Sequence, residues 1–242
     1  MSTASIAANA SAPSAEIRER RFFRHMAILL ALTVVAGFGG WFLKGYSAFA
    51  SPWWVHVHAI SNMSWIALLV AQTTFIARGD PARHRALGKV GVLLAAWMLL
   101  VGLVLTPYDI AAHRFPAAYF SPAVFLALDW MNIAVFAALV LAGWMKRKQS
   151  DWHRRLMLAA TVIVIIPAWG RLLLIAGLPG QLSALFSLLY MAIAMIADRR
   201  LRGHIHRAWY VGIAALVVMM VGSGLLSNFP PLITYANALN GS

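Results

Sequence analysis

Apolar positions divide the chain into seven long segments, each separated from the next by a short polar or charged stretch. A helix needs about 20 apolar residues to cross roughly 30 Å of hydrocarbon. The separators carry turn-forming and charged residues, and the segments lack the apolar–polar alternation of barrel strands. The pattern therefore predicts seven transmembrane helices, at about 25–43, 54–77, 87–106, 118–144, 154–177, 182–197 and 208–227.

Composition agrees with a membrane protein. Of the 242 residues, 62% are apolar and 11% are charged, whereas a soluble domain is about 45–50% apolar and about 25% charged. These values exclude a soluble enzyme and a disordered chain. The absence of cysteine excludes disulfides, iron–sulfur clusters and thiolate metal sites. We expect an all-α, integral membrane bundle whose main partner is the lipid bilayer.

The basic residues set the orientation of this bundle. The net charge of +13 would suggest nucleic acid in a soluble protein. Here, however, 17 of the 20 Lys and Arg residues lie in the N-terminal tail and in alternate loops, at 18–24, 78–89, 146–155 and 199–207. Because basic loops stay on the cytoplasmic side, we expect no nucleic-acid partner, an inside N-terminus and a place in the bacterial inner membrane.

This orientation gives a simple division of the chain. Residues 1–20 are predicted to form a disordered cytoplasmic tail, since the first 15 are rich in Ser and Ala. Residues 21–230 form the seven-helix transmembrane domain, and residues 231–242 form a short outer tail.

The dipeptide His-Arg occurs at the start of three helices predicted to run outward, as His84-Arg85, His153-Arg154 and His206-Arg207. It suggests three repeated helical hairpins, whose three outward helices would be neighbours. Neutral imidazoles bind metals and haem iron, so His84, His153 and His206 are candidates for a shared site. The alternative is that these histidines only accompany topogenic arginines, whose positive field disfavours a bound cation.

Ionisable groups inside a span are costly and indicate function by default. Asp129 lies near the middle of its segment, and Arg171 lies near the outer end of the next one, so an ion pair between them is sterically reasonable. Together with polar residues of neighbouring spans they suggest an outer polar cavity, lined by His58, Asn62, Asp129, Asn132, Arg171 and Tyr190. The alternative is that these groups hold the helices together by hydrogen bonds.

Three sequence patterns resemble a group of uncharacterised bacterial multi-pass membrane proteins. They are His58…Trp65…Gln72…His84-Arg85-Ala86-Leu87-Gly88, Asp151-Trp152-His153-Arg154-Arg155-Leu156-Met157…Arg171, and Arg202-Gly203-His204-Ile205-His206. Arg207 stands where the group usually has Pro. The resemblance covers about residues 21–215 and implies a multi-pass helical fold, with no known activity.

Three functions remain open at this point. The histidines favour a redox protein that binds haem b or a metal ion. The predicted cavity favours a carrier of a small hydrophobic or polar ligand, and a purely structural use of the polar groups favours an accessory membrane subunit. No phosphate-binding loop, zinc-protease helix or nucleophile elbow occurs, so no catalytic residue is assigned.

Overall fold

The long helices begin where short polar side chains and prolines mark a helix start. In the computed structural model, which describes residues 14–241, the Ser14 hydroxyl accepts a hydrogen bond from the Ile17 N–H. Asp80 and Ser121 act in the same way, and each is followed by a proline at the first helical position. The helices are α1 (Ala15–Leu43), α2 (Trp53–Ala77), α3 (Pro81–Ala111), α4 (Pro122–Met145), α5 (Ser150–Val164), α6 (Ile166–Ile175), α7 (Ser183–Arg202), α8 (Ala208–Ser227) and α9 (Pro230–Asn240).

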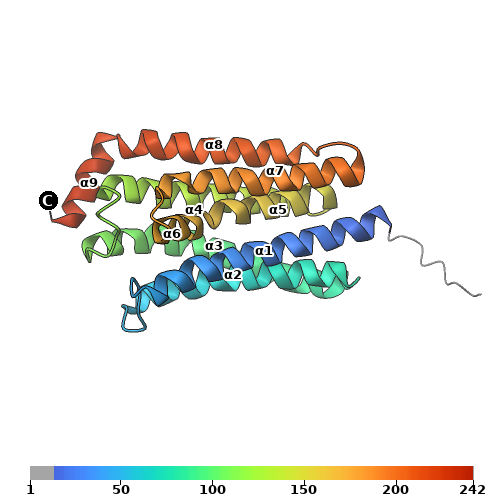
Figure 1. Ribbon diagram of the computed structural model, residues 1–242, viewed down its shortest axis with the longest axis horizontal. Helices are drawn as coiled ribbons and strands as arrows, with labels where there is room; N and C mark the ends of the chain where they lie inside the picture. Colours follow the sequence, from blue (N-terminus) through green and yellow to red (C-terminus); the bar gives the residue numbers. More distant parts are fainter. Residues whose placement is uncertain (1–13, 242) are drawn as a thin grey trace, which may run out of the picture.

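Seven spans are confirmed among the described residues, all of them helical. Helices α5 and α6 together form one span, and a 3-10 turn at Gly180–Leu182 leads into α7. Most helices run along the long axis of the bundle, while α9 crosses its end (Figure 1). Helix α4 is the central element, because it packs on α3, α5, α8 and α9.

Two segments differ from the sequence prediction. The helix α1 begins at Ala15, so residues 15–20 are helical instead of forming part of a tail, while residues 1–13 lie outside the described part. At the other terminus, residues 230–240 form α9, which buries Leu232 and Ala236 against the bundle. Helix α9 is not one of the seven spans and lies across the end of α3 and α4.

Two prolines interrupt the backbone hydrogen bonding of helices, and in both cases a side chain of α4 supplies the missing donor. A proline lacks the N–H that would bond the carbonyl four residues earlier. Pro107 lies inside α3, and the freed Leu103 carbonyl accepts a hydrogen bond of 3.2 Å from the Trp130 indole. Pro167 lies where α5 gives way to α6, and the freed Ile163 carbonyl accepts one of 2.8 Å from the Asn132 amide.

Helix α3 therefore continues to Ala111, beyond the predicted end of the span at 106, because α4 supplies the missing donor.

We refer to the two ends of the bundle as the basic end and the outer end. The basic end holds the start of α1 and the turns that join α2 to α3, α4 to α5 and α7 to α8. The outer end holds α9 and the remaining connections. By the charge asymmetry described above, the basic end is expected to face the cytoplasm.

Candidate functional site

The residues of the predicted outer cavity are engaged mainly in helix packing. The Asn62 amide donates to the His58 carbonyl on its own helix at 2.9 Å, and Asn132 bonds the Ile163 carbonyl described above. The Tyr190 hydroxyl lies 2.5 Å from the Thr33 hydroxyl and joins α7 to α1. Two surface grooves lined by residues of α7 lie at the opposite end of the bundle.

The two charged residues of that cavity do not form a direct ion pair in the described part of the chain. The Asp129 carboxylate accepts a hydrogen bond from the Thr106 hydroxyl. The Arg171 guanidinium donates to the Pro167 carbonyl at 3.0 Å and lies over the Phe38 ring, 4.2 Å from its centroid. The Asp129 and Arg171 side chains are close enough to interact electrostatically, although they do not contact each other.

The basic end contains a buried ionic network. Its centre is Arg155 of α5, whose side chain is completely buried. The Arg155 guanidinium contacts Glu19 of α1 at 2.8 Å and Asp198 of α7 at 2.5 Å. Asp198 also accepts a bond of 2.8 Å from the indole of Trp209 on α8. One arginine thus connects four helices.

Two further arginines complete this network. Arg202 contacts Glu19 at 2.8 Å and Asp151 at 2.7 Å. Arg154 contacts Glu19 at 3.0 Å and also pairs with Asp151. The group therefore contains three arginines and three carboxylates. The group is close to neutral although it lies in the most basic part of the sequence.

Two of the three His-Arg histidines face each other at the basic end. The rings of His84 on α3 and His153 on α5 are 6.0 Å apart between centroids and nearly perpendicular, at 81°. The His153 Nδ1 lies 2.9 Å from the Gly143 carbonyl of α4. An Nδ1–H that donates to this carbonyl leaves Nε2 as the ligating nitrogen, the usual arrangement behind a metal-bound histidine.

The surroundings of this pair contain small residues and unsatisfied polar atoms. The His84 Nδ1 and the Gln72 Oε1 are both buried without a hydrogen-bond partner, and the Gln72 backbone lies beside the His84 ring. Gly88 follows His84 by one turn, and the nearest side-chain atom to the place of its missing Cβ is the Gln72 Nε2, at 3.6 Å. Buried polar atoms without partners are rare in native proteins and ask for an explanation such as an absent ion or ligand.

The third histidine, His206, does not join the pair. Its Nδ1 accepts a hydrogen bond of 3.1 Å from the Ala208 N–H at the start of α8, and its ring packs edge-on against Trp152. Burial lowers the pKa of His206, and the nearby Arg155 adds to this effect. Residues 14–241 contain no group of three His, Cys, Asp or Glu side chains placed to hold a metal ion.

Helix packing alone does not decide which histidines meet, because His153 of α5 faces His84 of α3 and not His206, although α5 packs on α8. Helix α4 packs on α3, α5 and α8 and lies between α3 and the other two. The predicted neighbourhood of the three outward helices therefore holds for α5 and α8, which pack together, and not for α3.

Sequence reasoning missed the acidic half of the network. Glu19 is 3% exposed, although the sequence placed it in a tail. The positive-inside rule counts basic residues and gives acidic ones little weight. A usable signal existed nonetheless, because five of the seven acidic residues lie within or beside basic clusters, namely Glu16, Glu19, Asp80, Asp151 and Asp198.

Comparisons with protein-family models, curated proteins and solved structures found no match to this chain. The resemblance to a bacterial membrane-protein group therefore stays a prediction, and the arguments for function come from the chain itself.

Proposed function

We propose that this chain is a bacterial inner-membrane electron-transfer protein that holds one haem b between His84 and His153. The observation that carries the proposal is the pair of imidazoles, 6.0 Å apart and contributed by different helices. Metal–nitrogen bonds are about 2.0–2.1 Å long. Two such bonds, added to the distance from each ring centre to its nitrogen, span nearly the same length.

The groups around the pair fit such a cofactor. The contact between His153 and the Gly143 carbonyl fixes one ligand in orientation. The His84 Nδ1 is a buried atom without a hydrogen-bond partner, which supports a ligand at this nitrogen.

The two arginines that follow His153 are paired with carboxylates, which weakens their repulsion of a bound cation. Arg154 adjoins His153, yet it pairs with Glu19 and Asp151. Its neighbour Arg155 pairs with Glu19 and Asp198. The field that would repel a metal ion is therefore largely cancelled, because the carboxylates lie within a few ångströms of the guanidinium groups.

Haem bound here would supply one-electron redox chemistry. His84 and His153 would each supply an imidazole nitrogen as a ligand. Arg85, which is exposed and interacts electrostatically with His84, is a cation suited to a carboxylate of the macrocycle. The carrier hypothesis has less support, since Asp129, Asn132 and Tyr190 of the predicted cavity are bonded to neighbouring helices.

The test is the visible absorption spectrum of the full chain, expressed with added haem and purified in detergent. We expect a Soret band and sharp bands on reduction, both lost in His84→Ala and in His153→Ala. His204→Ala is the matched control, because His204 lies at the same end, is exposed, and should leave the spectrum unchanged.

Two results would overturn the proposal. One is a folded, colourless protein from cells saturated with haem, which would favour the accessory-subunit hypothesis if metal analysis were also negative. The other is a haem spectrum that survives removal of both histidines. Stoichiometric metal without haem would keep the histidine site and replace the cofactor.

A further inference from the structure

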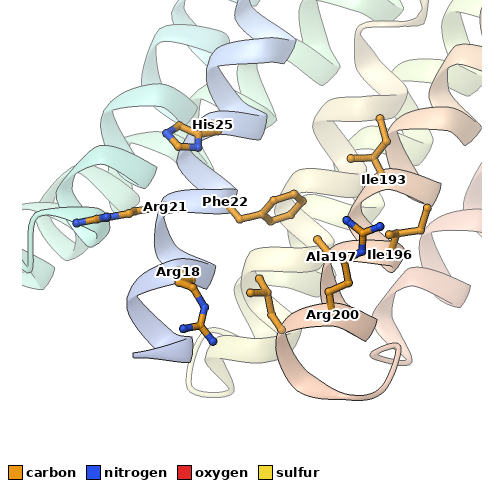
Figure 2. Close-up of a pocket in the computed structure, with 9 residues that line it drawn as sticks. Arg18, Arg21, Phe22, His25, Ile193, Ile196, Ala197 and Arg200 are labelled. Carbon is orange, nitrogen blue, oxygen red and sulfur yellow. The ribbon is translucent and has the colours of Figure 1, made fainter. Parts of the chain in front are cut away.

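A groove of about 510 Å³ lies between α1 and α7 at the basic end of the bundle. Its walls are mainly apolar: Phe22 points from α1 towards α7, while Ile193 and Ile196 line the α7 side (Figure 2). Arg18 and Arg200 also border it, whereas Arg21 points away from α7 in this view. The groove thus joins an apolar wall to two cationic groups.

A second groove of about 380 Å³ lies next to the first. It is also lined by Ile196 and Arg200, together with apolar residues such as Met195 and Ile205. Ile196 and Arg200 are four residues apart and therefore share one face of α7. They form a ridge with an apolar groove on each side and a cation at its basic end.

We propose that this ridge binds one diacyl anionic phospholipid, with an acyl chain in each groove and the phosphate at Arg200 and Arg18. The apolar walls match hydrocarbon chains, and their number matches the two chains of a membrane lipid. Basic pockets between helices on the cytoplasmic side are suited to anionic headgroups. The site lies away from the His84–His153 pair and is independent of the haem proposal.

The ionic network explains why Arg200 is available for this role. Arg202, two residues later, points into the bundle and pairs with Glu19 and Asp151. Arg200 lies on the exposed side of α7 and borders both grooves. The three arginines at 199–202 thus differ in role. Arg202 belongs to the ionic network, Arg199 lines the second groove and donates to the Gly203 carbonyl at 2.7 Å, and Arg200 borders both grooves, where it can meet a phosphate.

The test is native mass spectrometry of the full chain in a zwitterionic detergent. The protein is titrated with diacyl phosphatidylglycerol and, separately, with phosphatidylcholine of the same chains. We expect at least tenfold tighter binding of phosphatidylglycerol. Arg18→Gln with Arg200→Gln should weaken it by about thirtyfold, because each basic residue near an anionic lipid surface contributes about fivefold.

A charge-matched control separates this site from general attraction. Arg78→Gln with Lys148→Gln removes two exposed charges from the same end of the bundle, away from the grooves, and should leave binding nearly unchanged. Ala197→Trp retains both arginines and fills the first groove, which Ala197 lines. It should weaken both lipids, because it removes space for a chain.

Several outcomes contradict the proposal. Equal binding of the two lipids, or an equal loss in the control variant, would show that no specific headgroup site exists. Displacement of the lipid by millimolar inorganic phosphate would reduce the site to a simple anion site without chain binding. A lipid-free dimer that is lost in Ala197→Trp would show that a second copy of the chain occupies the groove. The double arginine variant changes only surface side chains and decides the question even if Ala197→Trp does not fold.

Discussion

The two ends of the bundle accommodate buried arginines in opposite ways. At the basic end, Arg155 is bonded to carboxylates of two other helices, α1 and α7. At the outer end, Arg171 donates to a carbonyl of its own helix and rests on the ring of Phe38, while the nearest relevant acid, Asp129, bonds Thr106 instead. Arg155 ties helices together through opposite charges, whereas Arg171 meets α1 through an aromatic face.

The difference shows where charge contributes to architecture. Near the interface, the cost of burying a charged side chain is offset by several short ion pairs with residues of different helices. Removal of one charged residue therefore leaves its partners buried and unpaired. Deeper in the apolar region, the chain relies on neutral donors from α4, Asn132 and Trp130, to satisfy carbonyls freed by proline. The predictions below perturb each end in turn.

The largest effect is expected from Arg155→Met. This change leaves Glu19 and Asp198 buried without their shared partner, and loss of one member of a buried ionic group typically costs about 3–5 kcal/mol. Denaturant unfolding in detergent measures the free energy of unfolding. Arg83→Met is the control, because Arg83 is exposed and pairs with Asp80 at 3.4 Å, an interaction of about 0–1 kcal/mol. Equal losses in the two variants would contradict the structural role of the network.

An intermediate effect is expected from Asn132→Leu, which leaves the Ile163 carbonyl without a donor. An unsatisfied buried carbonyl costs about 1–3 kcal/mol. In a Pro167→Ala background the backbone N–H of residue 167 is restored and becomes available to the same carbonyl. The cost of Asn132→Leu should therefore be smaller in that background, as a double-mutant cycle of unfolding free energies would show. An identical cost in both backgrounds would mean that the proline and the asparagine act independently.

The smallest effect concerns pH at the basic end. Because burial lowers the pKa of His206, the folded protein binds a proton less readily there than the unfolded chain does. The contribution of His206 to stability is present above the unfolded value of about 6.5 and is lost as the pH falls through it. His206→Asn keeps an acceptor for the Ala208 N–H and does not titrate. Its unfolding free energy should fall less than that of the parent between pH 7.5 and 5, and parallel curves would refute this role.

The sequence pattern predicted the spans correctly but missed contacts between residues of different helices. The seven apolar segments could be identified from the sequence because a helix that crosses hydrocarbon must be continuously apolar, whatever the tertiary arrangement. The predicted end at 106 was too early because Pro and Asp usually mark loops. The indole of Trp130, which bonds the carbonyl freed by Pro107, is more than 20 residues away. Asn132 was assigned to a cavity for the same reason: its partner lies on another helix.

The candidate site shows the same limit. The sequence identified His84, His153 and His206 as equivalent, because each precedes an arginine near the start of a helix. The fold brings the first two to within 6.0 Å between ring centroids and turns the third towards Trp152. The sequence also treated Arg154 and Arg155 as topogenic charge, although both contact Glu19, more than 130 residues earlier, and each contacts a further carboxylate.

By itself, the sequence determined the all-helical class, the seven spans and the expected orientation, since these depend on local hydropathy and on the side on which basic residues lie. Only the tertiary structure decided which polar groups meet. Hydrogen bonds and ion pairs act over a few ångströms between residues far apart in the chain, and helix packing around α4 sets which of them come within reach. For this reason the pairing of His84 with His153, and of Arg155 with Glu19, could be identified only once the helices were in place.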